Sequence, residues 1–368
     1  MQNICPQDNI YQMDKATTSQ LKGIAILSML WLHLFSSGDL TATLANTVYF
    51  YNGAPLATVM KKICSMCVPV YIFLGGYGLA VTHERAVAQG RRMRNWRRVL
   101  SLYANLWTVF LFFYPLGLAF NPQLFNTGIY DAALNLTGLK CSMNGAWWFL
   151  LQYAILTLLS DRILKLIYSA GVKHEILMLV PVFMLYAGAY VAVDSVNPDH
   201  SGTAGLVVIN VLRIFMLLFM FMAGVMFARH RLIEKLRSRL TSRYSYGRIN
   251  VTAACTAAVL LFIKLCIGAS SLIHPWFVMI LIPLYAVCKR PAWADRMFEY
   301  FGRHSTNMWL IHYFFVHYIF GNAIYSLRYP VVIWIVLVAV SLVSSYIVGF
   351  VYAPIRRLVR QERPVISR

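Results

Sequence analysis

Runs of about twenty aliphatic and aromatic residues recur along this chain and constrain its fold more than any other feature. A helix of this length matches the roughly 30 Å thickness of the hydrocarbon core of a bilayer. Charged residues make up only 12% of the 368 positions, which is about half their share in an average soluble domain. The sequence therefore predicts an all-α, polytopic membrane protein whose backbone polar groups are satisfied within helices.

Ten segments are expected to cross the membrane. They lie at 21–38, 62–82, 98–120, 145–166, 175–194, 205–228, 249–269, 275–289, 304–321 and 330–353. Because the eighth segment is marginal in length, nine and eleven crossings are alternatives. We expect 1–20 to be a cytoplasmic segment, 21–353 the bundle and 354–368 a basic cytoplasmic tail. A Thr-x-x-Gln pattern at 17–20 predicts that the first helix starts near residue 20.

Positive charge is distributed unevenly between the two predicted sides of the membrane. With both termini in the cytoplasm, all but six of the 33 lysines and arginines fall on the cytoplasmic side or in the cytoplasmic tails. Basic residues in short loops favour that side, so this orientation is predicted. The net charge of +20 is then explained by topology and by contact with anionic lipids. It requires no nucleic-acid partner.

Lys22 and His33 share one face of the first predicted helix. Eleven residues separate them, which leaves the side chains about 20° apart around the axis and about 16 Å apart along it. Ionisable residues inside a membrane helix indicate a functional site by default. His33 is suited to general-base chemistry on a hydroxyl. The alternative is a lysine that snorkels to the interface and a histidine that is only packed.

His312 is expected at a depth similar to that of His33, if their two helices start at the same interface. It is then an orienting partner or a second acid/base, and the alternative is an interfacial packing residue. No aspartate or glutamate falls well inside a predicted span, which argues against an ion-coupled transporter. Cys64 and Cys67 lack a second cysteine pair, so we interpret them as core residues and expect no metal site.

Three further motifs each have a functional and a structural interpretation. The arginine cluster at 91–98 offers forked donors for phosphate, although topology alone also places basic residues at a cytoplasmic helix end. The three glycines within 75–78 permit close helix packing, which we favour, or close approach of a ligand. Trp147 and Trp148 fit an aromatic belt at the interface, or a platform on which a sugar substrate stacks.

The ordered set of these features resembles the acyltransferase-3 family of membrane acyltransferases over nearly the whole chain. The set comprises Lys22 with His33, Phe73-Leu74-Gly75-Gly76-Tyr77, the arginine cluster, Trp148-Phe149, and Gly302-Arg303-His304-Ser305 with His312. The resemblance implies a multi-pass enzyme of the bacterial cytoplasmic (inner) membrane. It would move an acyl group, most simply acetyl, from cytoplasmic acyl-CoA to a hydroxyl of a surface or lipid-linked glycan.

Carried over to this chain, the resemblance makes His33 the catalytic residue and Lys22 a basic residue on the donor side. Arg92 with Arg94 is the literal match to the Arg-x-Arg signature that helps to bind the acyl donor. Arg97 and Arg98 are the alternative equivalents, because related chains carry arginine just inside the third helix. We further expect Arg213 to stabilise an oxyanion, with a structural ion pair as its alternative.

The expected partners are acyl-CoA, a glycan acceptor and membrane lipids, and a homo-oligomer is compatible with the sequence. Two rival functions fit the same composition. One is a non-catalytic flippase or exporter of polysaccharide intermediates, and the other is the membrane part of a receptor or anchoring complex. Replacing His33 separates the enzyme from the flippase. The enzyme should lose acyl transfer, whereas a flippase should continue to move its substrate.

Overall fold

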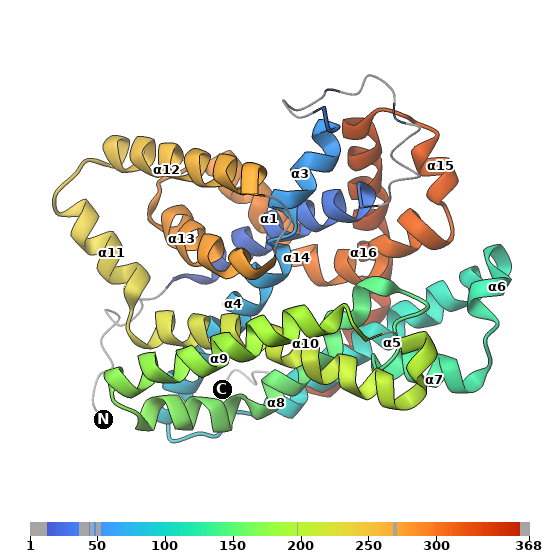
Figure 1. Cartoon of the computed structure of the whole chain (residues 1–368), viewed down its shortest axis with the longest axis horizontal. Coiled ribbons are helices and arrows are strands. Elements are labelled where there is room, and N and C mark those ends of the chain that lie inside the picture. Colours follow the sequence, from blue (N-terminus) through green and yellow to red (C-terminus); the bar gives the residue numbers. More distant parts are fainter. Residues whose placement is uncertain are drawn as a thin grey trace, which may run out of the picture.

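The computed structural model describes residues 13–36, 44, 48, 53–196, 198–267 and 271–360. The regular elements of these residues are helices, and they pack into one bundle (Figure 1). Their order is α1 (Lys15–Leu34), α3 (Leu56–Cys64), α4 (Cys67–Ala88), α5 (Asn95–Phe120), α6 (Pro122–Phe125), α7 (Ile129–Thr137), η2 (Gly145–Trp147), α8 (Trp148–Ser169), α9 (Val172–Val193), α10 (Pro198–Arg229), α11 (Leu232–Thr241), α12 (Tyr246–Ile267), η3 (Ser271–Ile273), α13 (His274–Val287), α14 (Ala292–Tyr313), η4 (Phe314–Tyr318), α15 (Gly321–Tyr325) and α16 (Pro330–Arg360).

The all-helical class predicted from the sequence is confirmed for the described residues, but neither the count of ten spans nor the cytoplasmic placement of both termini is. Six helical stretches of the described residues are long and apolar enough to cross a membrane. They are Leu56–Ala88, Asn95–Phe120, Val172–Val193, Gly202–Arg229, Tyr246–Ile267 and Pro330–Val359. The other predicted spans also overlap helical structure, but α1, α8 and α14 carry more polar residues and α13 is short.

The first helix begins at Lys15 and not near residue 20. Asp14 is its N-cap, and the Asp14 carboxylate accepts a hydrogen bond of 2.6 Å from the backbone N–H of Thr17. This cap satisfies one of the donors that a helix start leaves unpaired. The sequence prediction placed the cap within the Thr-x-x-Gln pattern, which instead forms part of the first turns.

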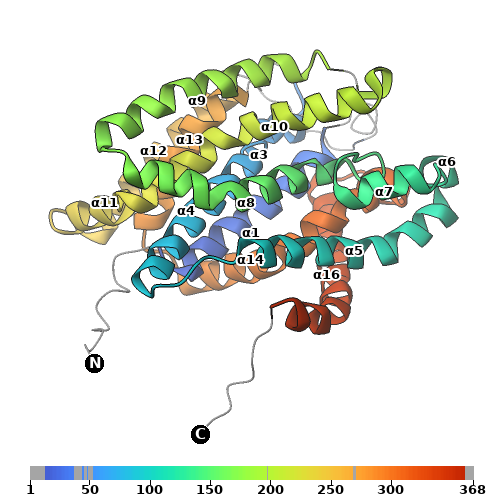
Figure 2. The ribbon, with the colours of Figure 1, turned by 90° about the horizontal axis from the view of Figure 1, so that it is seen from below.

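Two glycines bring α1 and α14 into backbone contact at the centre of the bundle (Figure 2). A Cβ atom on Gly23 would lie 2.0 Å from the carbonyl oxygen of Phe298, and one on Gly302 would lie 1.8 Å from that of Ser19. The two helices run parallel. The Ser19 hydroxyl donates to the Glu299 carbonyl in their first halves, and the rings of His33 and His312 meet at their ends. Parallel packing places equally distant residues at the same level.

A second glycine contact joins α4 to α10. A Cβ atom on Gly76 would lie 2.1 Å from the carbonyl oxygen of Phe221, and one on Gly224 would lie 2.1 Å from that of Phe73. Small residues commonly permit such close approach between membrane helices. The packing interpretation of the glycine motif is therefore confirmed for Gly76.

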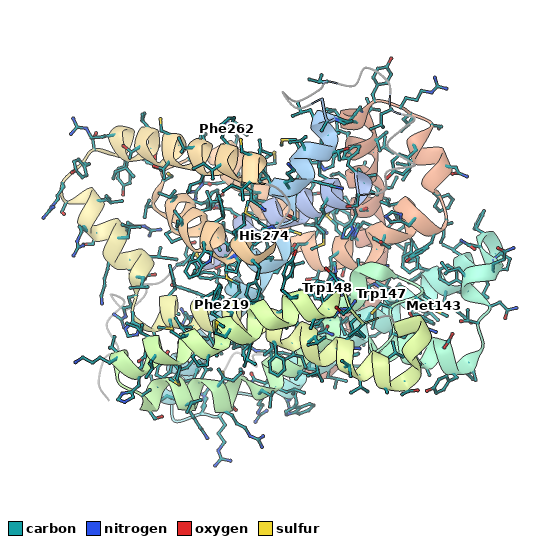
Figure 3. All side chains as sticks on the ribbon, in the orientation of Figure 1. Met143, Trp147, Trp148, Phe219, Phe262 and His274 are labelled. Carbon is teal, nitrogen blue, oxygen red and sulfur yellow. The ribbon has the colours of Figure 1, made fainter. Side chains whose placement is uncertain are left out.

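The helices at the periphery are apolar and mostly exposed. Only 11% of the apolar stretch of α9 and 17% of that of α12 is buried inside the protein. Phe262 of α12, for example, is 58% exposed and points away from the bundle (Figure 3). Side chains of this kind are stable facing lipid, so α9 and α12 fit the outer surface of a membrane bundle.

Candidate active site

His33 and His312 lie side by side where the parallel helices α1 and α14 end. Their ring centroids are 5.0 Å apart, and the rings are tilted by 39°. His33 follows the start of α1 by 18 residues, and His312 follows the start of α14 by 20. The equal depth expected from the sequence is thus present, although both helices start earlier than predicted.

The hydrogen bonds of His312 define which of its nitrogens carries the proton. Nδ1 faces the carbonyl oxygens of Met308 at 3.1 Å and Trp309 at 2.9 Å, so it must donate. In the neutral ring Nε2 is then the atom with the lone pair. Nε2 is buried and has no hydrogen-bond partner among the described residues. It is therefore a base or an acceptor that no neighbour already occupies.

Aromatic and imidazole rings enclose the other side of His33. The Tyr313 ring stands edge-on to His33 at 5.0 Å between centroids, and His317 packs on Tyr313 at 4.4 Å. His317 also interacts with the backbone of His33. Tyr313 is the last residue of α14, and η4 continues as a π-helical turn. Such turns are rare and occur frequently at functional sites.

A narrow cavity of about 240 Å³ runs beside α1 from Lys22 toward the two histidines. Lys22 and Arg98 are the charged residues of its wall, and no carboxylate lines it. Met29 and Trp309 also line it, and they precede His33 and His312 by four and three residues. Because one helical turn holds 3.6 residues, the cavity reaches within about one turn of the histidine pair.

Two glycines of the 75–78 motif line this cavity. A Cβ atom on Gly75 would meet the Tyr153 ring at 2.9 Å, and one on Gly78 would meet nothing within 4 Å. Side chains at these positions would occupy part of the cavity. Gly76 thus permits helix packing, and Gly75 and Gly78 leave space in the cavity, while the approach of a ligand to these glycines stays a prediction.

A wider, basic groove adjoins the narrow cavity, and we call it the arginine groove. Its volume is about 1180 Å³, and it lies between α5, α14 and α16. Five arginines and no carboxylate line it: Arg97, Arg98, Arg303, Arg356 and Arg357. The groove and the cavity share four wall residues, which are Arg98, Leu102, Tyr153 and Thr306. The two spaces are therefore neighbours along a single route.

Hydrogen bonds between three helices fix the wall of the arginine groove. Asn105 of α5 donates to the side-chain oxygen of Asn307 at 2.7 Å, and Asn307 donates to the backbone carbonyl of Ser345 at 3.1 Å. The ring of His304 bonds the Ser345 hydroxyl at 3.0 Å. Polar groups of α5, α14 and α16 thus hold one another, which keeps the groove in one shape before any ligand binds.

The structure separates the two candidate arginine pairs. Arg97 and Arg98 line the arginine groove, whereas Arg92 and Arg94 line neither it nor the cavity. Arg98 also donates to the hydroxyl of Thr82 at 3.1 Å. The alternative equivalents of the Arg-x-Arg signature, and not its literal match, therefore line the groove.

The sequence interpretation assigned no site role to three arginines of the groove. Arg356 and Arg357 were attributed to a basic tail, but α16 continues through Pro354 to Arg360 and carries them to the groove. Arg303 lines the groove from α14, and its guanidinium also forms an ion pair with the Glu299 carboxylate at 2.5 Å. The available signal was the position of these residues at the ends of two predicted spans.

The remaining site candidates lie behind the cavity wall. Arg213 of α10 stacks on the ring of Trp148, with 5.5 Å between its Cζ atom and the ring centroid. Trp148 contacts Phe149, which lines the cavity, whereas Arg213 itself lines neither the cavity nor the arginine groove. Trp147 is fully buried and donates to the Leu310 carbonyl at 2.9 Å, which positions η2 against α14 (Figure 3). Because the Trp147 ring is buried, it offers no face on which a sugar could stack.

Cysteine and metal-ligating residues do not gather at the site. Cys64 and Cys67 are buried free thiols. Within the parts of the chain that the structure describes, no group of three or more histidine, cysteine, aspartate or glutamate side chains could hold a metal ion.

Comparison with known proteins gives one match. A family model, Acyl_transf_3, described as an acyltransferase domain, matches residues 19–350, which contain most of α1, the histidine pair and most of the arginine groove. The chain matches no curated protein sequence and no solved structure.

Proposed function

Since this chain belongs to the acyltransferase-3 family of membrane acyltransferases, we propose that it transfers an acyl group from acyl-CoA to a hydroxyl of a glycan. The proposed acyl group is acetyl, and the proposed acceptor is a surface polysaccharide or a lipid-linked sugar. In this proposal the arginine groove faces the cytoplasm of a bacterial cell and the acceptor arrives from the opposite side of the membrane.

The observation that carries the proposal is the arginine groove and its junction with the narrow cavity. Guanidinium groups form paired hydrogen bonds with phosphate, and here Arg98, Arg356 and Arg357 gather without a carboxylate in the wall. The rings of Tyr346 and Phe350 line the same groove and offer faces on which a base can stack. These features fit the nucleotide end of CoA, which carries several phosphates and an adenine.

The narrow cavity fits the remainder of the donor. A thin chain entering beside Arg98 would pass Gly75 and Gly78 and lie along the face of α1 that carries Lys22. This face leads to His33, about 16 Å further along the helix axis. The pantetheine arm of CoA would then present its thioester beside the histidine pair, while the charged end stays in the groove.

In the proposed reaction His33 removes the proton of the acceptor hydroxyl while the oxygen attacks the thioester carbonyl. The new ester C–O bond forms, the C–S bond breaks, and the departing CoA thiolate takes the proton from the imidazolium. In this proposal His312 supports the step through Nε2, which has no partner among the described residues; on accepting a hydrogen bond from His33 it would select the nitrogen of His33 that acts as the base.

The test is acyl transfer by purified protein in lipid nanodiscs, with labelled acetyl-CoA and an acceptor glycan. His33→Ala should lower the rate by 10²-fold or more, within the range of general acid–base catalysis, and should retain CoA binding. His174→Ala, at an exposed histidine of α9, is the matched control. A His33→Ala protein that transfers at the wild-type rate would refute the mechanism, and label trapped on His33 would replace direct transfer by an acyl-enzyme.

A further inference from the structure

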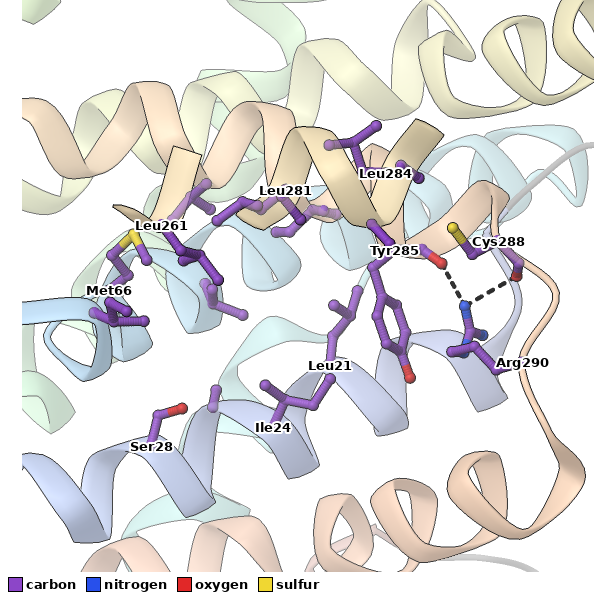
Figure 4. Close-up of a pocket in the computed structure, with 18 of the residues that line it drawn as sticks. Leu21, Ile24, Ser28, Met66, Leu261, Leu281, Leu284, Tyr285, Cys288 and Arg290 are labelled. Atoms are coloured by element: carbon purple, nitrogen blue, oxygen red, sulfur yellow. Dashed lines mark hydrogen bonds between the residues drawn. The ribbon is translucent and has the colours of Figure 1, made fainter. Parts of the chain in front are cut away.

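A second cavity, separate from the donor route, lies between α1, α4, α12 and α13 (Figure 4). Its volume is about 560 Å³, within the range of ordinary ligand pockets. On α1 it is lined by Leu21, Ala25 and Ser28, about a quarter turn away from the face that bears Lys22. The wall is otherwise almost wholly apolar, and its two charged residues are Lys289 and Arg290. We call this space the apolar pocket.

The apolar pocket exists because α12 is held at both ends and stands away from the bundle between them. Near one end the Asn250 amide accepts from the backbone N–H of Lys289 at 3.0 Å and donates to its carbonyl at 2.7 Å. Near the other end the Lys62 ammonium donates to the Leu265 carbonyl at 3.0 Å. Between these contacts the pocket side of α12 carries small residues, including Ala257, which cannot fill the gap.

The dimensions and exposure of the pocket fit one leaflet of a membrane. Asn250 and Leu261 of α12 both line it, and eleven residues of helix span about 16 Å, roughly half of the hydrocarbon core. In Figure 4, Met66 and Leu261 lie at one end of the pocket and Cys288 and Arg290 at the other. Because α12 is mostly exposed on the outer surface of the bundle, the occupant would come from the lipid phase.

The charged residues at one end of the pocket differ in availability. Arg290 is fully engaged, since it bonds Asp295 at 2.7 Å, Gln20 at 3.0 Å and the carbonyl oxygens of Tyr285 and Cys288. Lys289 is exposed, and its ammonium lies 5.8 Å from the centre of the Tyr246 ring. Lys289 therefore supplies the positive charge that a ligand at this end would meet.

We propose that the apolar pocket binds one acyl chain of an anionic phospholipid, with the phosphate of the lipid beside Lys289. Apolar cavities exclude water and take up apolar molecules. A lipid tail would restore the dispersion contacts that the separated helices α1, α12 and α13 lack. The confinement of the charged wall residues to one end, the depth of one leaflet and the lipid-facing position of α12 select a lipid over a protein partner. This proposal does not depend on the proposed function.

The test is native mass spectrometry of the whole purified chain, titrated with phosphatidylglycerol or phosphatidylcholine. Wild-type protein should bind one phosphatidylglycerol about fivefold more tightly than phosphatidylcholine, since one basic residue faces the head group. Ala257→Phe should weaken this binding by more than about tenfold, because each excluded methylene weakens it several-fold. Lys289→Gln should keep the lipid but lose the preference for the anionic head.

Gly188→Leu is the matched control, because Gly188 lines a different apolar groove on α9 that has no charged residue. A Cβ atom there meets nothing within 4 Å, so the variant should fold and bind lipid as the wild type does. Equal lipid binding by Ala257→Phe and wild type would overturn the proposal. So would a bound molecule of another class, or equal affinity for both lipids.

A second measurement needs no variant. Cys288 lines the apolar pocket, whereas Cys255 is exposed on α12 and does not. Added phosphatidylglycerol should slow the alkylation of Cys288 by N-ethylmaleimide at least fivefold and leave Cys255 unchanged, as read by peptide mass mapping. Unchanged alkylation of Cys288 at saturating lipid would overturn the proposal even if Ala257→Phe failed to fold.

Discussion

The central helices α1 and α14 differ from the peripheral helices α9 and α12 in polarity and in exposure. The peripheral pair is apolar and mostly exposed, as the lipid phase requires. The central pair carries Lys22, His33, Arg303 and His312, and its helices pack against each other and against α4, α5 and α16. Polar groups are tolerated inside a membrane bundle where they pair or line a cavity. Two of the helices that least resemble membrane spans are therefore the ones that carry the candidate histidines.

The largest expected effect comes from separating the central pair. A Cβ atom at position 302 would lie 1.8 Å from the carbonyl oxygen of Ser19, so the substitution Gly302→Val forces α1 and α14 apart. The cost should reach or exceed the roughly 1–3 kcal/mol typical of overpacked cores. We expect little monodisperse protein after size-exclusion chromatography and no acyl transfer.

The peripheral counterpart is Gly188→Val on α9, where a Cβ atom has open space. This variant should match the wild type in its elution from size-exclusion chromatography and in its thermal unfolding temperature. If both variants behaved alike, the distinction between a tightly packed centre and a tolerant periphery would fail.

The next effect sharpens the role of His312 within the central pair. His312→Asn keeps a donor near the Met308 and Trp309 carbonyls but removes the lone pair of Nε2. We expect the transfer rate to fall about 100-fold, at the lower end of acid–base contributions, with CoA binding unchanged. His312→Gln offers an oxygen near the position of Nε2 and should recover part of the rate. Equal rates for the two variants would assign His312 to packing alone.

A smaller effect compares arginines that line the arginine groove with an arginine that lies outside it. Arg98→Gln should raise the KM for acyl-CoA about tenfold, which corresponds to the loss of one charge-assisted hydrogen bond. Arg356→Gln should act in the same way, because Arg356 lines the same groove from α16. Arg92→Gln should change KM less than about twofold, since Arg92 lies outside the groove. Steady-state kinetics that ranked Arg92 above Arg98 would restore the literal Arg-x-Arg assignment.

Much of the candidate site was accessible from the sequence, because helix geometry converts spacing into position. Lys22 and His33 share a face at any helix start, and His312 reaches the level of His33 because α1 and α14 both begin earlier than predicted. The arginines were harder to assign. Arg92, Arg94, Arg97 and Arg98 are equally basic in sequence, and only the direction of each side chain separates them.

The sequence by itself determined that the helices of this protein face lipid and which of its polar residues share a helix face. Apolar length decides that helices cross a membrane, and a period of 3.6 residues decides which side chains share a face. The tertiary structure alone decided that Arg356 and Arg357 join Arg98, that Trp147 is sealed, and that α12 leaves a pocket beside α1. These outcomes depend on contacts between helices distant in the chain, and no local pattern encodes the distance between two helices.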